Sequence, residues 1–289
     1  ALYGTDVIPE DGGAKNAGSI NPARAKKVVE YSKKFLDETF PIDNGSWKNI
    51  TNIKIENKHL VASIQKSTFH LKDQSQFKGY SGDEKKPKSI LLKNNNLHCD
   101  ILIDAESSVG KEDTAGISNI ILESAISTII DHEDSVAAVD GSDKTEVYRN
   151  WLGLMNGTLS TTVKKGAVSF QRRLNADRYY FAPDGTSFSL PGRALMLVRN
   201  VGHLMTSPAI LDDNDKEVFE GILDSVVTAL IALHDLNDSA NRNSRTGAMY
   251  VVKPKMHGPE EVQFTIELFE RTEKLLNMAP GTMKVGIMD

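Results

Sequence analysis

The stretch LMLVRNVGHLM, residues 195–205, decides the fold class of this sequence. Its first four residues are apolar, as in a strand that is covered on both faces. Arg199 then ends the apolar run, and an arginine is seldom fully buried unless it is paired. Parallel sheets carry their sites where the strands end, so this residue predicts a site at the carboxyl edge of such a sheet.

Strands and helices alternate on both sides of this stretch. Runs of continuous apolar character that are separated by helices predict parallel βαβ units. The predicted strands cover residues 128–134, 193–203, 247–258 and 282–289, and the predicted helices cover residues 144–155, 219–237 and 259–278. The first of these strands is expected to be buried. Each strand ends in polar or charged residues, which are Glu133 and Asp134, Arg199 and Asn200, Lys253 and Lys255, and Asp289.

The first part of the chain has a different pattern. Residues 21–40 begin with Asn-Pro, a helix start signal, and continue as an amphipathic helix whose basic face is expected to lie in water. Residues 50–104 alternate apolar and polar side chains. Polar breaks at residues 56–58 and 94–96 contain asparagine, which tolerates left-handed turns, and they predict two hairpins.

A second helix is predicted directly after these hairpins. It rests on an apolar stripe of Ile117, Ile121, Leu122, Ala125 and Ile126. The β-rich pattern then returns over residues 158–193. We therefore expect residues 1–123 to form a small α+β unit to which this later segment also contributes.

Composition argues against several classes of protein. The 289 residues carry 34 basic and 39 acidic side chains, a formal net charge of -5, which does not favour a nucleic-acid partner. Cys99 is the one cysteine, so an internal disulfide is excluded and a reducing compartment is expected. No apolar run has the length of a membrane span, and the first residues lack the pattern of a secretory signal. The strand-like residues 282–289 predict that the sequence is part of a longer enzyme.

Four motifs carry a resemblance to a known family. They are DHEDSVAAVDGSDKTEVYRNWLGLM (131–155), PGRALMLVRNVGHLM (191–205), NSRTGAMYVVKPKMHGPEEV (243–262) and MAPGTMKVGIMD (278–289). Together they resemble the malate synthases of the G isoform, in order and over essentially the whole chain.

The resemblance implies a TIM (β/α)8 barrel with an inserted α/β domain. This chain would carry the inserted domain in two pieces, residues 1–123 and 157–193. Barrel strand two and its helix would occupy residues 124–156, and strands three to five with their helices residues 194–289. The first strand, the last three strands and the helical domains at both ends of the family's fold would lie outside it.

The family's reaction is the Mg²⁺-dependent condensation of acetyl-CoA with glyoxylate and water, which gives malate and CoA in the glyoxylate bypass of the tricarboxylic acid cycle. The resemblance implies a cytoplasmic, monomeric enzyme without nucleic-acid or membrane partners. The Mg²⁺ ligands would lie beyond Asp289, and so would the aspartate base, so no metal ligand is expected within this chain. The chain alone is therefore expected to be inactive.

Three residues of this sequence match functional residues of the family. Arg199 matches the active-site arginine that binds glyoxylate and stabilises developing negative charge; a guanidinium stays protonated and can donate from two positions. Ser135 and Arg172 match acetyl-CoA contacts. Without the resemblance, Arg199 would equally be a structural arginine paired with Glu133 or Asp134, Ser135 a turn residue, and Arg172 a solvated arginine.

Other polar residues near the strand ends have weaker assignments. Glu133 and Asp134 are expected to orient Arg199 or the water around the metal, without touching substrate. The resemblance names no role for His203, Lys253, Lys255 and His257. Two positions depart from the family pattern: His132 stands where cysteine is expected, and Asn96 stands where glycine is expected.

Two alternatives to malate synthesis are open at this point. The first is a Mg²⁺-dependent lyase of the barrel type that cleaves CoA esters of hydroxy acids; the two-piece insertion disfavours it. The second is a non-catalytic CoA-binding fragment. Acetyl-CoA consumption with glyoxylate against malyl-CoA cleavage would separate the two enzymes.

Overall fold

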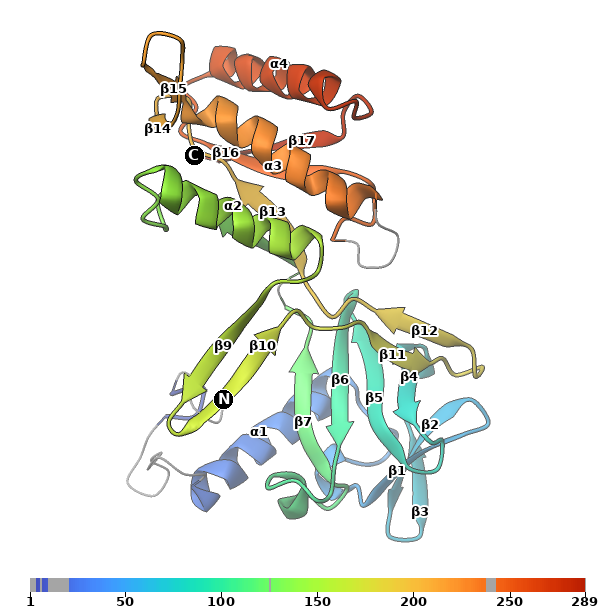
Figure 1. The fold of residues 1–289 in the computed structure, drawn as a ribbon. Helices are drawn as coiled ribbons and strands as arrows, with labels where there is room; N and C mark the ends of the chain where they lie inside the picture. Colours follow the sequence, from blue (N-terminus) through green and yellow to red (C-terminus); the bar gives the residue numbers. More distant parts are fainter. Residues whose placement is uncertain (1–3, 6, 10–20, 125, 238–242, 289) are drawn as a thin grey trace. The chain divides into compact units, whose positions relative to one another are not determined.

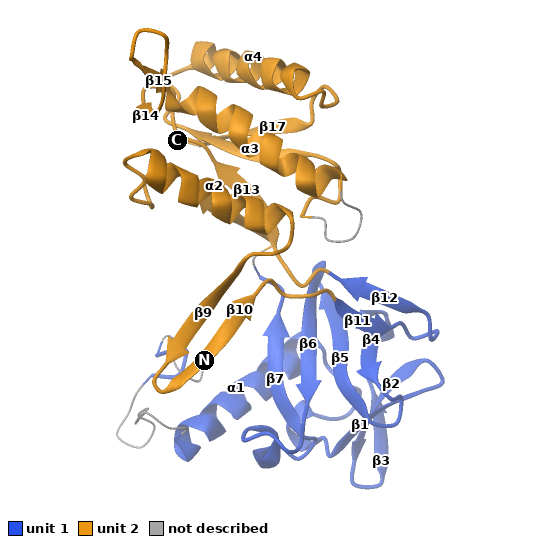
Figure 2. Cartoon of the chain, viewed as in Figure 1, with its two compact units in different colours: residues 1–124, 178–190 blue, residues 125–177, 191–289 orange. Residues whose placement is uncertain are grey.

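The computed structural model describes residues 4–5, 7–9, 21–124, 126–237 and 243–288 (Figure 1). The chain divides into two compact units, each with its own apolar core. Unit 1 comprises residues 1–124 and 178–190, and unit 2 comprises residues 125–177 and 191–289 (Figure 2). None of the helices in the described part of the chain is long and apolar enough to cross a membrane.

In its described residues, unit 1 has one α-helix, three short 3-10 helices (Trp47–Asn49, Gln74–Gln76 and Gly110–Glu112) and two antiparallel sheets, a three-stranded sheet β1-β2-β3 and a six-stranded sheet β12-β11-β4-β5-β6-β7. Its core gathers Leu36, Trp47, Ile90 and Leu92, all fully buried. The elements are α1 (Pro22–Thr39), β1 (Asn52–Glu56), β2 (His59–Ile64), β3 (Ser67–His70), β4 (Phe77–Gly82), β5 (Pro87–Asn94), β6 (Leu97–Ile103), β7 (Ile117–Leu122), β11 (Arg178–Phe181) and β12 (Ser187–Leu190).

Both predicted hairpins are confirmed. Asn57 and Lys58 have φ angles of 52° and 69° between β1 and β2. Asn95 and Asn96 have φ angles of 48° and 63° between β5 and β6. Two consecutive residues with positive φ form the turn whose twist matches that of the flanking strands. The predicted helix start is also confirmed, because the Asn21 side chain accepts from the first backbone N–H groups of α1.

One expectation for unit 1 is wrong, and another holds only in part. Residues Ile117–Leu122 of the predicted apolar stripe form the strand β7, which pairs antiparallel with β6, so the predicted helix does not form there; Ala125 lies outside the described residues. A short apolar run fits either period, and pairing with the neighbouring strand decides between them. The basic face of α1 is only partly in water: Arg24 and Lys33 are buried, and Lys33 forms a 2.7 Å ion pair with Asp113.

Unit 2 is built on a parallel sheet with the strand order β8-β13-β16-β17. These strands are β8 (Ser127–Asp131), β13 (Leu195–Arg199), β16 (Met249–Pro254) and β17 (Met283–Met288), and the helices are α2 (Gly141–Met155), α3 (Glu220–Asn237) and α4 (Pro259–Leu275). The predicted alternation of strands and helices is therefore confirmed. Figure 1 shows the three helices side by side over one face of the sheet.

Alternate strand residues point to this helical layer. Val198, Val251 and Met283 are buried against α2, α3 and α4, in a core that also contains Trp151 and Phe269. Because side chains alternate along a strand, Arg199, which follows Val198, points to the opposite face.

The strand predicted at residues 128–134 differs from β8 in two ways. It ends earlier, at Asp131, and residues 132–134 belong to the turn that follows. It is also half exposed rather than buried, because β8 is an outer strand of the sheet.

Two hairpins complete unit 2, and the second of them is not predicted from the sequence. They are β9 (Ser160–Lys165) with β10 (Val168–Arg173), and β14 (Thr206–Leu211) with β15 (Glu217–Phe219). Of the β-rich segment 158–193, β11 and β12 belong to unit 1, whereas β9 and β10 group with unit 2. The insertion boundaries given by the resemblance remain a prediction.

Candidate active site at the carboxyl ends of the parallel strands

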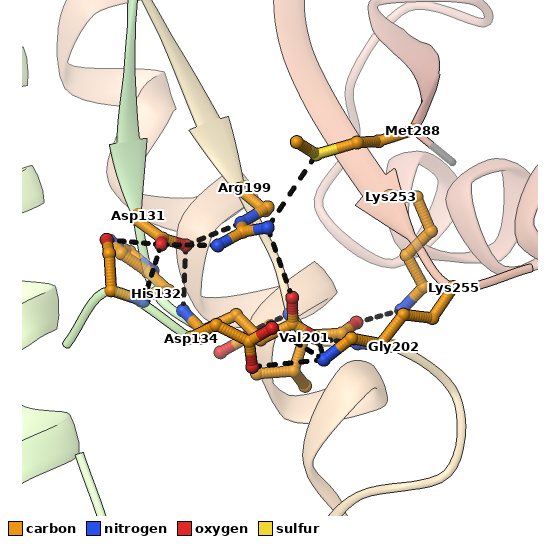
Figure 3. Close-up of polar contacts among 12 residues, drawn as sticks. Asp131, His132, Asp134, Arg199, Val201, Gly202, Lys253, Lys255 and Met288 are labelled. Carbon is orange, nitrogen blue, oxygen red and sulfur yellow. Dashed lines mark hydrogen bonds and ion pairs between the residues drawn. The ribbon is translucent and has the colours of Figure 1, made fainter. Parts of the chain in front are cut away.

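Arg199 and Asp131 form the centre of the site. They are register partners at the ends of the adjacent parallel strands β13 and β8. Arg199 donates through Nε to Asp131 Oδ1 at 2.7 Å and through Nη2 to Oδ2, which is a two-point clamp (Figure 3). The clamp holds the pKa of Asp131 well below its usual range and raises the pKa of Arg199. Both groups are therefore ionised at neutral pH.

Two further acids lie beside this pair. Glu133 Oε2 is 3.5 Å from Arg199 Nη1, and Glu133 Oε1 accepts from the backbone N–H of Gly202 at 3.2 Å. Lys255 donates to Asp134 at 2.8 Å and forms a 3.3 Å ion pair with Glu133. Contact with these carboxylates raises the pKa of Lys255. Asp134 is thus the partner of the lysine, and the arginine is held by Asp131.

One edge of the arginine has no strong partner among the described residues. The nearest groups to Nη1 are Glu133 Oε2 and the Met288 sulfur, the latter at 3.7 Å and a weak acceptor. The Arg199 side chain as a whole is 15% exposed, so it is largely buried but not closed off from solvent. A guanidinium that is oriented on one side and open on another suits the binding of an anionic group.

A buried charged layer supports the turns that follow β8 and β13. Lys144 of α2 forms ion pairs with Glu220 at 2.6 Å and with Asp224 at 2.9 Å, and it donates to the backbone carbonyl of His132 at 3.2 Å. Lys253 of β16 donates to the backbone carbonyl of Val201 at 2.6 Å. Burial lowers the pKa of Lys253 to about 8.

His132 lies in the same turn and is almost completely buried. Neither of its ring nitrogens has a hydrogen-bond partner in the described structure. Its ring contacts the Tyr148 ring edge to face, with 5.8 Å between centroids. Burial lowers the pKa of His132 to about 4, so the imidazole is neutral at pH 7.

The other residues singled out in the sequence are placed as follows. The Ser135 hydroxyl donates to Asp131, and its backbone N–H donates to the same carboxylate at 2.9 Å. Arg172 is exposed on β10, and within the described residues no hydrogen bond or ion pair joins it to Arg199. His203 bonds to Thr265 at 2.8 Å, and the His257 backbone N–H donates to Glu261 at 2.8 Å. The last two are structural contacts of α4.

Sequence reasoning missed Asp131, Lys144 and Asp224. Asp131 could have been found from the strand register, because it ends β8 where Arg199 ends β13. Lys144 and Asp224 lie in helices whose other residues read as ordinary amphipathic faces, and no local signal marks them as buried.

The described residues do not by themselves make a metal site. Among them, no group of three or more His, Cys, Asp or Glu side chains could hold a metal ion. Asp131 is already committed to Arg199 and Ser135, while Glu133 Oε2 is buried without a hydrogen bond. The described residues thus do not fit a resident Mg²⁺ ion.

Comparisons with known proteins identify the family of this chain. The family model of the malate synthase G alpha-beta insertion domain matches residues 20–94, and that of the malate synthase TIM barrel domain matches residues 195–289. Malate synthase G of Halalkalibacterium halodurans is 52% identical over the whole chain, and the proteins of that name from Corynebacterium efficiens and Corynebacterium glutamicum are each 47% identical.

The chain spans about 40% of the length of these curated relatives. The two matching models fall in different units of the structure, the insertion model in unit 1 and the barrel model in unit 2. With two malate synthase models matched and 47–52% identity along its entire length, the chain belongs to the malate synthase G family.

Proposed function

We propose that this chain is the part of a malate synthase that supplies the charge-stabilising arginine. The whole enzyme would join acetyl-CoA to glyoxylate and release malate and CoA, with Mg²⁺ bound by residues outside the described part of the chain. One observation carries the proposal: Arg199 is clamped by Asp131 at a parallel strand end, while among the described residues its Nη1, the open edge, makes longer contacts, at 3.5 Å to Glu133 and at 3.7 Å to the Met288 sulfur. The resemblance at this motif supports the same assignment.

The reaction requires such a cation at two stages. A base outside the described residues would take a methyl proton from acetyl-CoA, and negative charge would move onto the thioester oxygen as the enolate forms. The enolate carbon then attacks the glyoxylate aldehyde, the C=O π bond breaks as the carbon–carbon bond forms, and the charge moves to the former aldehyde oxygen. That oxygen takes up a proton to become the malate hydroxyl, and water finally cleaves the thioester into a carboxylate and CoA. The open edge of Arg199 can donate to the glyoxylate carboxylate or to one of these oxygens. Preorganised donors of this kind are usually the largest single contribution to lowering the activation barrier.

The fold supports a partial barrel. The four parallel strands are neighbours in chain order, and their helices cover one face. An open doubly wound sheet has helices on both faces and a reversal of strand order, whereas a (β/α)8 barrel has neither. We propose that the four strands are barrel strands two to five, with the inserted domain contributed by residues 1–123 and 157–193.

Substrate contacts are proposed at two further positions. The Ser135 hydroxyl lies at the strand-end edge and would turn from Asp131 to acetyl-CoA, while Arg172 on the exposed β10 would meet the phosphates or adenine of CoA. Glu133 and Asp134 would act through Arg199 and Lys255 rather than on substrate. We further propose that the whole protein is a cytoplasmic, monomeric enzyme of the glyoxylate bypass.

The test is thiol release from acetyl-CoA, dependent on glyoxylate and Mg²⁺, by the complete gene product. Arg199→Lys keeps the charge and removes the two-point geometry, so kcat should fall by about 100-fold or more. Arg149→Lys, an exposed arginine of α2, is the matched control and should retain full activity. Full activity of Arg199→Lys would make Arg199 a structural charge. Cleavage of malyl-CoA, without condensation, by the wild type would indicate the lyase.

A further inference from the structure

Two buried side chains hold both polar groups of the Val201 backbone. Asp224 Oδ2 of α3 accepts from the Val201 N–H at 2.8 Å, and Lys253 Nζ of β16 donates to the Val201 carbonyl at 2.6 Å. Both side chains belong to residues that are 0% exposed. Val201 lies two residues after Arg199, just beyond the end of β13, and Figure 3 draws it together with Lys253. Asp224 of α3 and Lys253 of β16 therefore fix the Val201 backbone from two different elements.

The burial of Lys253 is energetically costly. Among the described residues, no carboxylate oxygen lies within 4.0 Å of the Lys253 ammonium group, so the lysine forms no ion pair with them. The ammonium also faces the start of α3, where the helix dipole is positive and disfavours a cation. Gly221 makes the room, because a Cβ at this position would lie 2.8 Å from Lys253 Nζ. The charges of Asp224 and Glu133 offset part of this cost, because they favour the protonated lysine.

The same charged layer also holds the turn after β8. Asp224 accepts from Lys144 at 2.9 Å and from the Tyr148 hydroxyl at 2.7 Å, and Lys144 donates to the His132 carbonyl. The His132 N–H in turn donates to the Arg199 carbonyl at 3.1 Å. The backbones on both sides of the Arg199–Asp131 clamp are therefore tied to one buried network.

We propose that Lys253 and Asp224 are positioning residues for Arg199. By holding the Val201 peptide they fix the end of β13, and with it the direction in which the open edge of the guanidinium points. The inference rests on the proposed function for its catalytic consequence. Neither side chain would touch substrate, because both lie on the face of the sheet that the helices cover, whereas Arg199 points to the opposite face.

The test combines kinetics and hydrogen exchange on the complete gene product. Lys253→Met keeps the length of the side chain and removes the donor. We expect kcat to fall about 10- to 100-fold, because small displacements of a charge-stabilising group are costly, while KM for acetyl-CoA stays within about twofold. Deuterium uptake in a peptide covering residues 195–205 should become faster. Asp224→Asn keeps an oxygen acceptor for the Val201 N–H and should lose less kcat than Asp224→Ala.

Lys33→Met is the matched control, because Lys33 is another buried lysine and lies in unit 1. It should leave kcat, KM and exchange at residues 195–205 unchanged. Unchanged exchange in Lys253→Met and Asp224→Ala would overturn the inference, and so would altered exchange with wild-type kinetics. A wild type without glyoxylate-dependent thiol release would contradict the proposed function instead, and exchange alone would then decide whether the pair holds the segment.

Discussion

Arg199 and Lys253 lie on neighbouring strands and show two ways of placing a cation at a strand end. Arg199 has a carboxylate in two-point contact, so its charge is compensated and its orientation is fixed. Lys253 has only a backbone carbonyl as hydrogen-bond partner among the described residues, and burial lowers its pKa to about 8. Arg199 therefore keeps an N–H group that can donate to a substrate, whereas Lys253 donates its hydrogen bond to the protein backbone.

The buried imidazole of His132 should make the free energy of unfolding depend on pH. Its folded-state pKa is about 4, below the ordinary 6.5, because the buried ring has no partner for a proton. The unfolded chain binds that proton below pH 6.5 while the folded chain does not, so acid favours unfolding between pH 6.5 and 4. Relative to His132→Cys, the wild type should lose up to about 1.4 kcal/mol of unfolding free energy per pH unit in this window. Urea unfolding at several pH values measures the difference, and parallel pH dependences would contradict it.

At the scale of elements, the sequence predicts turns and helix starts, which depend on a few neighbouring residues. It does not predict features that depend on which strands pair and in which register. Asparagine at two turns fixes the hairpins β1–β2 and β5–β6, and a proline start predicts α4, because each signal acts within a few residues. Ile117 to Leu122 was misassigned to a helix, since its apolar spacing is ambiguous and the partner strand β6 decides. Which of three neighbouring acids clamps Arg199 likewise depends on the β8–β13 register.

The sheet of unit 1 contains an interaction that tests such long-range pairing. Tyr180 of β11 donates to Asp100 of β6 at 2.6 Å, and both residues are buried. Burial and this carboxylate raise the pKa of Tyr180, so it stays a donor. Among the described residues, Tyr180→Phe would leave the Asp100 side chain with a single contact, at 3.4 Å from Arg178. We expect a loss of about 1.5–3 kcal/mol in the free energy of unfolding.

The neighbouring tyrosine provides the control for that measurement. Tyr179 lies on the same strand but is 73% exposed, so Tyr179→Phe should change the free energy of unfolding by less than about 0.5 kcal/mol. Chemical denaturation followed by circular dichroism compares the two variants. Equal effects would mean that the buried Asp100 finds another donor.

At the scale of the whole molecule, the parallel sheet of unit 2 carries exposed apolar side chains on both of its edge strands. The edge strand β17 of the parallel sheet carries Ile287 at 65% exposure, and the opposite edge strand β8 carries Ile129 at 45%. Natural edge strands are normally protected by charge, bulges or a covering element. Exposed apolar side chains on two unpaired edges instead favour association.

The 289-residue chain, prepared by itself, should therefore associate as its concentration rises. A lysine on the edge opposes such pairing, so Ile287→Lys should weaken association by about tenfold or more. Val139→Lys is the control, because Val139 is 78% exposed and lies in the loop between β8 and α2, outside the edge strands. Sedimentation velocity between about 1 and 100 µM, where edge pairing would show, separates the outcomes. A wild-type chain that stays monomeric over this range would show that these edges are not adhesive, and equal weakening by both lysines would assign the association to net charge rather than to strand pairing.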